Sequence, residues 1–253
     1  MGLIKNASEV AAIREACRIA GKVLDEMGAA VLPGVTTLEL DQYAAERIRA
    51  AGARSAFLGY RNFPRHTCIS VNDEVVHGIA GTRRLMFGDI VSLDVGVVHR
   101  GFVGDTAATF AVGGIDPSVQ RLLEVTQRAL EAGIAQARNG LHVEDISRAV
   151  QSLVEGEGFS VVREFVGHGV GRSVHEEPQV PNFVERAGKS PKLRSGMTIA
   201  IEPMVNAGRR EVRVLNDGWT VVTSDGKLSA HFEHTVLITD GMPEILTCRG
   251  KTP

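Results

Sequence analysis

Two segments of the chain show similar patterns in the same order, and this repetition constrains the fold more than any other feature. Gly34-Val-Thr-Thr-Leu-Glu-Leu40 and Gly140-Leu-His-Val-Glu-Asp-Ile146 lie 106 positions apart. Gly88-Asp-Ile-Val-Ser-Leu-Asp94 and Gly196-Met-Thr-Ile-Ala-Ile-Glu202 lie 108 positions apart, and each places a carboxylate six residues after a glycine. Matches of this length also arise by chance, but their shared order favours a structural repeat.

The first half has the pattern of two helices followed by strands. Ser8 can cap a helix that Leu32-Pro33-Gly34 ends, because apolar residues follow at steps of three and four: Ile13, Cys17, Ala20, Leu24 and Met27. Thr36 and Glu39 form a capping box that begins a second helix, and Gly52 is a natural stop for it. Residues 57–76 are rich in turns, whereas residues 89–96 and 102–111 have the apolar runs of strands.

The second half follows the same plan. Asp116 and Pro117 begin a third helix, and a fourth spans about residues 143–155. We therefore expect an α/β (α+β) fold in one catalytic domain, residues 1–253, with repeats at about 8–112 and 116–245. If the halves pack around an approximate two-fold axis, equivalent strands bring Asp94 and Glu202 to one central place.

Composition excludes several classes of protein. Apolar residues make up 43% of the 253 positions, enough for a large core, and the net charge of −2 comes without a basic stripe for nucleic acid. The three cysteines, Cys17, Cys68 and Cys248, lie far apart without a C-x-x-C motif, which argues against a zinc knuckle or a disulfide framework and favours a reducing cytoplasm. No apolar run has the length of a signal peptide or a membrane span.

Two acidic residues occupy positions where a carboxylate is costly. Asp94 stands between Leu93 and Val95, and Glu202 follows Ile201, in segments predicted to be apolar strands. An ionised carboxylate in such surroundings costs several kcal/mol unless a cation or hydrogen-bond donors compensate it. Either residue alone could instead belong to the polar face of a half-buried strand.

Three further residues strengthen the hypothesis of a metal site. Asp105, His168 and Glu233 also occur in strand or tight-turn contexts, which gives four carboxylates and one imidazole. This oxygen-rich set suits Mn, Fe, Co or Zn and is typical of a two-metal hydrolytic site rather than of a structural zinc site. Two ions about 3.5 to 4 Å apart can share a water, lower its pKa and polarise a carbonyl, so amide hydrolysis is the predicted chemistry.

The sequence does not match the motifs of other common catalytic or phosphate-binding sites. The segment Gly167-His-Gly-Val-Gly171 lacks the Gly-Lys-Ser/Thr of a phosphate loop, and we interpret its glycines as letting backbone approach the metals and the substrate closely. Neither a His-Glu-x-x-His helix nor a Gly-x-Ser-x-Gly elbow is present, which argues against a single-zinc protease and a serine hydrolase.

Seven short motifs, spread over nearly the whole chain, resemble those of type I methionine aminopeptidases in order and spacing. They are Asn72-Asp-Glu-Val-Val-His-Gly78, Ser92-Leu-Asp-Val-Gly96, Gly104-Asp-Thr-Ala107, Gly167-His-Gly-Val-Gly-Arg172, His175-Glu-Glu-Pro178, Ile201-Glu-Pro-Met204 and His231-Phe-Glu-His-Thr235. The resemblance implies the pita-bread fold, in which helices back a curved antiparallel sheet. It also implies removal of the initiator methionine from new polypeptides whose second residue is small.

The same resemblance assigns roles to the five predicted ligands. Asp94 would chelate one metal ion, Asp105 and Glu233 would bridge two ions, and His168 and Glu202 would hold the other. Glu202 would also act as the proton shuttle. The implied cofactor is a pair of divalent ions, Co, Mn, Fe or Zn.

The resemblance further implies a substrate pocket. His77 would contact the substrate amide, and His175 the scissile carbonyl, where it stabilises charge on the tetrahedral oxygen; without the resemblance both would be interpreted as core or surface imidazoles. The implied methionine pocket is apolar and consists of Tyr60, Phe63, Cys68, Val174 and Trp219. Phe63 and Val174 stand where the family more often has Tyr and Phe, which predicts a wider or softer pocket.

Two alternatives stay open. A prolidase or X-Pro aminopeptidase would use similar ligands but usually carries an extra N-terminal domain, for which a helix pair starting near residue 8 leaves no room. A non-catalytic binding protein of the same fold would have lost ligands, and none is lost. We expect a monomer in the cytoplasm that acts on nascent chains, with the ribosome as a candidate partner. Met1-Gly2 satisfies the small-second-residue rule, so the chain is predicted to process itself.

Overall fold

The computed structural model describes residues 3–184 and 190–247. Its helices are α1 (Ala7–Ala29), α2 (Thr37–Ala50), the 3-10 turn η1 (Tyr60–Asn62), α3 (Pro117–Ala135) and α4 (Val143–Gly156). A nine-stranded antiparallel sheet contains β1 (Arg54–Ser55), β2 (Cys68–Val71), β4 (Ile90–His99), β5 (Phe102–Ala111), β7 (Gly167–Gly169), β8 (Glu176–Val180), β9 (Thr198–Ile201), β14 (Glu233–Leu237) and β15 (Glu244–Ile245).

The remaining strands of the described residues form two three-stranded sheets. One consists of β13 (Ser229–His231), β10 (Met204–Asn206) and β6 (Ser160–Val161), and the other of β11 (Val212–Val214), β12 (Val221–Thr223) and β3 (Glu74–Val76). Two of the expectations above concern Met1 and Cys248, which lie outside the described residues. Within the described ranges, no helix is long and apolar enough to cross a membrane.

The predicted helix starts are largely confirmed, with one correction. Thr36 and Glu39 form the predicted capping box of α2, and Asp116 with Pro117 begins α3. The cap of α1, however, is Asn6 and not Ser8. The Asn6 side chain accepts the Glu9 amide, and the Ser8 hydroxyl donates to that same Asn6 oxygen, so Ser8 already lies inside the helix.

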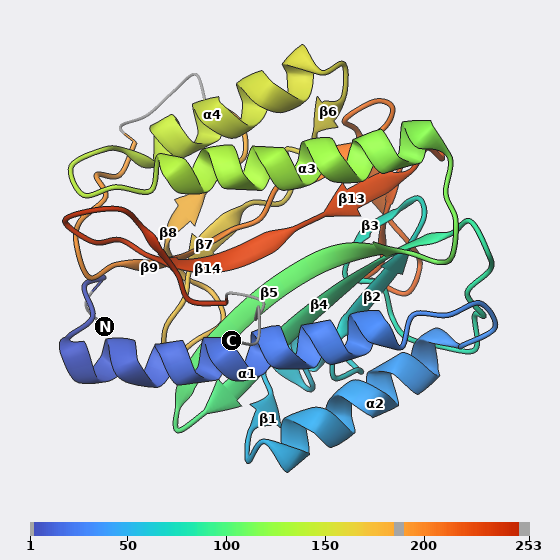
Figure 1. Ribbon diagram of the computed structural model, residues 1–253, viewed down its shortest axis with the longest axis horizontal. Coiled ribbons are helices and arrows are strands. Elements are labelled where there is room, and N and C mark those ends of the chain that lie inside the picture. The colour runs from blue at the N-terminus through green and yellow to red at the C-terminus, as the bar shows by residue number, and fades with distance from the viewer. Residues whose placement is uncertain (1–2, 185–189, 248–253) are drawn as a thin grey trace.

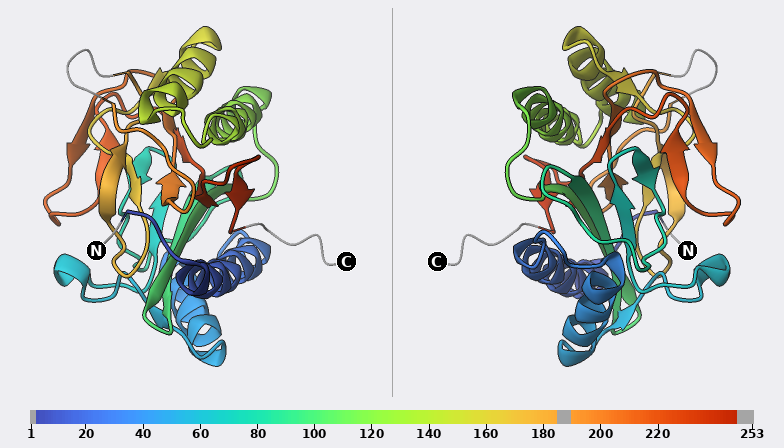
Figure 2. Two further views of the ribbon diagram at one scale, coloured as in Figure 1. Left: turned by 90° about the vertical axis from the view of Figure 1, so that its left-hand side faces the viewer. Right: turned by 90° about the vertical axis from the view of Figure 1, so that its right-hand side faces the viewer.

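The four helices lie on one face of the nine-stranded sheet (Figures 1 and 2). The central part of the sheet has the order β4-β5-β14-β9-β7-β8; α1 packs against β4 and β5, and α3 packs against β9 and β14. Leucine, isoleucine and valine side chains from both layers fill the space between helices and sheet. The opposite face of the central strands is thereby left for polar groups.

Strand β5 from the first half of the chain and strand β14 from the second are antiparallel neighbours, with Ala107 opposite Glu233. Equivalent backbone hydrogen bonds recur in each half. Gly34 N–H donates to Leu85 O and Gly140 N–H to Leu193 O, while Gly88 N–H donates to Val112 O and Gly196 N–H to Ile238 O. Gly34 and Gly140 also share a left-handed backbone, with φ of 89° and 94°. These matches support the two repeats.

Candidate active site

Three neighbouring strands bring three acidic residues together. Asp94 on β4 lies opposite Ala107 on β5, and Ala107 in turn lies opposite Glu233 on β14. Asp105 lies two residues earlier on β5. Its neighbour Gly104 faces α1, where a Cβ would come within 2.4 Å of the Cys17 backbone nitrogen, so the alternation of the strand turns Asp105 to the other face.

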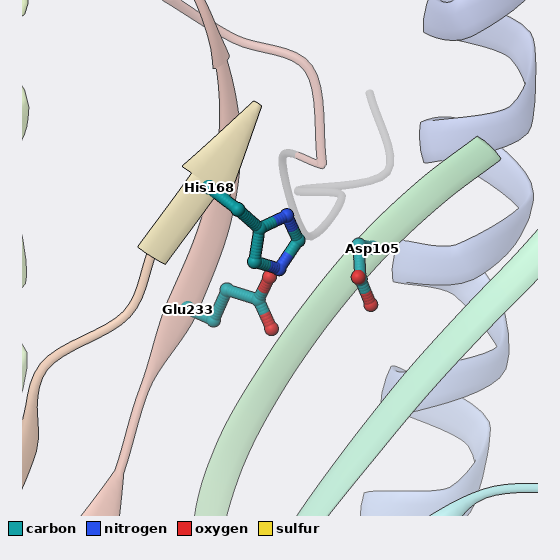
Figure 3. Close-up of side chains that lie close together, drawn as sticks. All are labelled: Asp105, His168 and Glu233. Carbon is teal, nitrogen blue, oxygen red and sulfur yellow. The ribbon is translucent and has the colours of Figure 1, made fainter. Parts of the chain in front are cut away.

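An imidazole completes this group from β7. The ring of His168 points into the space between Asp105 and Glu233 (Figure 3), and potential ligand atoms of these three residues all lie within 4.8 Å of one another. His168 Nδ1 donates to the Gly169 carbonyl at 3.0 Å, which leaves the lone pair of a neutral ring on Nε2. His168 Nε2 lies 3.3 Å from a carboxylate oxygen of Glu202, the residue after β9.

The residues of this centre fit a divalent metal. Within the described part of the chain, the buried oxygens Asp94 Oδ1 and Asp105 Oδ1 have no hydrogen-bond partner. Two potential acceptors, His168 Nε2 and the Glu202 carboxylate, face each other at 3.3 Å, an arrangement that requires a proton or a cation between them. Oxygen donors with one imidazole suit Mn, Fe, Co or Zn.

The protonation of the carboxyl groups supports this interpretation. Burial and the neighbouring carboxylates raise the pKa values of Asp94 and Glu233 well above their ordinary range, and burial raises that of Asp105 to about 7. Burial alone would also raise the pKa of Glu202, but His231 and His168 outweigh it and hold that pKa below its ordinary value. A cation would let the remaining carboxyl groups ionise.

A cavity of about 550 Å³ contains the whole group. All twelve residues predicted as ligands, catalytic groups or pocket residues line it: Tyr60, Phe63, Cys68, His77, Asp94, Asp105, His168, Val174, His175, Glu202, Trp219 and Glu233. Residues that the sequence did not single out also line it, among them Phe57 and Phe165. Polar and apolar groups therefore meet in one space of the size of a small ligand.

One wall of the cavity is apolar and separate from the main core. Its cluster of buried side chains includes Phe57, Phe63, Cys68 and Val174, with Trp219 packed against them. The Trp219 ring meets Phe63 edge to face at a centroid distance of 5.0 Å. This wall can accept an uncharged side chain next to the acidic cluster.

Two histidines stand between the acidic cluster and the apolar wall. His175 lies 4.3 Å from His168 by ring centroid, and its Nδ1 is 2.9 Å from the Tyr60 hydroxyl. His77 has a left-handed backbone, φ 60°, and packs edge to face against Phe165. Burial lowers the pKa of each to about 4, so both rings are neutral near pH 7.

Sequence reasoning missed His231. This residue is buried, its Nε2 makes no hydrogen bond within the described residues, and that atom lies 3.5 Å from a Glu202 oxygen. The strand pairing of the structure identifies it: His231 lies opposite Met204, and Asp105 lies opposite Gly96. Gly96 and Met204 are 108 positions apart, which is the offset between Asp94 and Glu202. His231 is thus the counterpart of Asp105 in the second half.

Two glycines of the glycine-rich segment pack tightly against neighbouring strands. A Cβ at Gly167 would come within 2.3 Å of the Ala200 carbonyl oxygen, and one at Gly169 within 2.2 Å of the Glu177 carbonyl oxygen. These glycines therefore allow close approach of the neighbouring strands β9 and β8. His168, between them, is thereby held deep in the sheet.

Comparison with known proteins agrees with this geometry. The model of metallopeptidase family M24 matches residues 11–240. The chain belongs to family M24. Within this family it is 51% identical to a methionine aminopeptidase of Clostridium perfringens, over 98% of this chain and 99% of the relative. A solved structure of methionine aminopeptidase from Rickettsia prowazekii is 39% identical, with a TM-score of 0.94 over 97% of this chain and 99% of that one.

Other M24-like structures share the fold alone. A prolidase from Pyrococcus furiosus is 22% identical with a TM-score of 0.79, and the match covers 98% of this chain but only 66% of the prolidase. These similarities confirm the predicted pita-bread fold with its antiparallel sheet. Full-length similarity to methionine aminopeptidases favours the main prediction over the prolidase alternative.

The stabilisation of this M24 protein by a divalent ion is expected to grow with pH. In the folded metal-free protein, the pKa of Asp105 near 7 lets its carboxyl keep a proton that the unfolded chain loses near 3.8. The free energy of unfolding of the metal-free protein therefore falls as pH rises through this window, and Asp94 and Glu233 contribute in the same direction. A cation favours the ionised carboxylates instead, so protons compete with it.

The measurement is the difference in melting temperature between metal-loaded and metal-stripped protein at about pH 5.5 and about pH 7.5. His77 and His175 act with the opposite sign, because their lowered pKa values remove stability as pH falls from 6.5 towards 4. Their effect is common to both forms and largely cancels in the difference. A difference that stays constant or shrinks as pH rises would contradict the prediction.

Proposed function

We propose that this protein is a methionine aminopeptidase that removes the N-terminal methionine of polypeptides whose second residue is small. The observation that carries the proposal is the single cavity in which a cluster of four carboxyl groups and His168 faces an apolar wall. The wall suits an unbranched thioether, because aromatic rings beside sulfur add about 0.3 to 1.5 kcal/mol. The methionine aminopeptidases to which the chain is similar match it over nearly their full length.

The proposed cofactor is two divalent ions. Asp94 would chelate one ion, Asp105 and Glu233 would bridge both, and His168 and Glu202 would hold the second. When bound, such ions lower the pKa of water and polarise the scissile carbonyl. The chain's contribution is to keep four carboxylates and one imidazole converging in one cavity.

A hydrogen bond from Tyr60 supports the proposed role of His175. With the Tyr60 hydroxyl as donor to Nδ1 at 2.9 Å, the proton of the neutral ring is on Nε2. Nε2–H can then donate to the substrate carbonyl oxygen, most strongly once that oxygen carries negative charge. Tyr60, predicted as an apolar pocket residue, therefore also orients a catalytic group.

The remaining proton chemistry is assigned to Glu202 and His77. Glu202 has a lowered pKa, so it is ionised near pH 7 and can accept a proton from the attacking water and pass it to the leaving amine. His77, neutral and buried at the cavity wall, can hydrogen-bond the substrate amide. Cys68, Phe63, Val174 and Trp219 would bind the methionine side chain.

Further parts of the proposal concern the whole molecule. We propose one catalytic domain, with repeats at about 8–112 and 116–245, that acts as a monomer in the cytoplasm on nascent chains from the ribosome. The matched hydrogen bonds of the two halves support the repeats.

The substrate class is tested by release of free methionine from Met-Gly-Met, compared with Met-Leu and X-Pro peptides. We expect rapid release from Met-Gly-Met and little cleavage of the other two. Glu202→Gln, which keeps the size of the side chain but removes its charge, is the matched control for contaminating peptidases. Preference for X-Pro would establish the prolidase alternative, and binding of Met-Gly-Met without cleavage would establish a non-catalytic binding protein.

A further inference from the structure

A buried lysine lies at the start of the chain, far in sequence from the active site. The side chain of Lys5 is 1% exposed, an uncommon environment for an ammonium group. Its Nζ donates to Glu176 Oε2 at 2.7 Å, and its backbone N–H donates to the Gly196 carbonyl at 2.8 Å. The segment before α1 is therefore fixed by one ion pair and one backbone hydrogen bond.

The partner of Lys5 organises the loop between β7 and β8. Glu176 Oε2 accepts the hydrogen bond from Lys5 Nζ. The other oxygen, Oε1, accepts hydrogen bonds from the backbone N–H groups of Arg172 at 2.8 Å and Ser173 at 3.2 Å. The carboxylate folds over Gly171, where a Cβ would come within 2.6 Å of both its oxygens. One carboxylate thus ties the two ends of a short loop to the N-terminal segment.

This loop carries two proposed active-site residues. Val174 is part of the apolar wall, and His175, adjacent to Glu176, lies between the Tyr60 hydroxyl and the ring of His168. At its start the loop is held by the Val103 N–H, which donates to the Gly171 carbonyl at 2.7 Å. At its end, Glu176 pairs with Gly169 of β7, and the Glu176 side chain is held by Lys5.

We propose that Lys5 is a positioning residue for catalysis: through Glu176 it fixes the 171–176 loop so that His175 is presented to the scissile carbonyl. The inference rests on the proposed function. A buried pair is costly to break, because removal of one partner leaves the other charge uncompensated. Loss of the lysine therefore lets the loop relax, and a displacement of about 1 Å at a reacting group can cost roughly 10²-fold in rate.

The test compares Lys5→Met with Lys22→Met in the metal-loaded enzyme. Lys22, on α1, is the control because its side chain is 66% exposed and lies 3.8 Å from Glu26. We expect Lys5→Met to lower kcat for Met-Gly-Met by roughly 10-fold to 10²-fold with little change in KM. Lys5→Arg should restore part of the activity, and Lys22→Met should match the wild type.

A double substitution separates positioning from general destabilisation. In a His175→Ala background, Lys5→Met should lower kcat no further, because the group that it positions is gone. An equal loss in both backgrounds, or an unchanged kcat in Lys5→Met, would overturn the proposal. If Lys5→Met fails to fold, Glu176→Gln serves in the same comparison, since it removes the charge and keeps the shape.

Hydrogen exchange tests the loop independently of turnover. The amides of Arg172 and Ser173, which donate to Glu176, should exchange faster in Lys5→Met than in the wild type, while amides of β4 should not change. Unchanged exchange at both loop amides would contradict the inference. Absence of methionine release from wild-type enzyme would instead refute the proposed function, and the exchange comparison would still decide whether Lys5 holds the loop.

Discussion

Replacement of Asp105 with asparagine is expected to lower kcat/KM for Met-Gly-Met by at least roughly 10³-fold, about 4 kcal/mol of transition-state stabilisation. Asp105 is buried, and ligand atoms of Asp105, His168 and Glu233 lie within 4.8 Å of one another. An asparagine has almost the same shape, but its neutral amide is a weaker ligand for a divalent cation than a carboxylate. The loss should therefore appear together with weaker metal binding.

The same substitution should raise the melting temperature of the metal-free protein. Burial raises the pKa of Asp105 to about 7, so near pH 7.5 its charge opposes folding, and the amide removes that charge. A gain of about 1 kcal/mol corresponds to roughly 2–4 °C for a chain of this size. Calorimetry of the stripped protein checks the expected rise in melting temperature. Kinetics and metal titration of the loaded protein check the expected losses of activity and of metal affinity.

Asp116→Asn is the matched control, because Asp116 precedes α3 and its side chain makes no capping hydrogen bond. It should leave activity and metal binding unchanged. Retention of wild-type activity in Asp105→Asn would show that Asp105 does not belong to a metal centre. A fall in the melting temperature of the metal-free variant would contradict the claim that the charge of Asp105 opposes folding.

Replacement of His175 with alanine is expected to lower kcat by roughly 10²-fold to 10³-fold, the usual cost of losing one donor to a developing oxyanion. The KM should change little, because the hydrogen bond strengthens only in the transition state. Metal content should stay at the wild-type level, since no metal role is proposed for His175. Steady-state kinetics with Met-Gly-Met and metal analysis of the purified variant provide the measurement.

Tyr60→Phe is the companion variant, because it removes the hydroxyl 2.9 Å from His175 Nδ1 and keeps the ring. It should give a smaller loss of kcat, about 10-fold, through a less well fixed imidazole. A large rise in KM with unchanged kcat in His175→Ala would mean that this residue only binds the substrate.

Elements with local signals were predictable from the sequence. The Thr36–Glu39 capping box, Pro117 at the start of α3, and strand β5 all match the structure, because caps and apolar periodicity act over a few residues. The cap of α1 was misassigned because Asn6 and Ser8 are both good capping residues, and only the Asn6–Glu9 hydrogen bonds distinguish them. The proximity of Asp94 and Glu202 was predicted from their equivalent positions in the two repeats, and not from a local sequence pattern.

Elements whose partners lie far along the chain had no such signal. Residues 57–76 contain β3, which pairs with β12 about 150 residues later, so this short strand is defined by a distant neighbour. The Lys5–Glu176 pair spans 171 residues and leaves no periodic trace. The predicted ligand set needed the family resemblance for its roles, since the spacing of acidic residues indicates a metal site but not which residue bridges.

The central claim is that this acidic cluster holds divalent ions that drive removal of N-terminal methionine. The most direct measurement is methionine release from Met-Gly-Met by protein that has been stripped with a chelator and then reloaded with Mn, Fe, Co or Zn. We predict no release by the stripped protein and recovery as metal is added to the wild type but not to Asp105→Asn. Undiminished release after complete stripping, confirmed by metal analysis, would contradict the account.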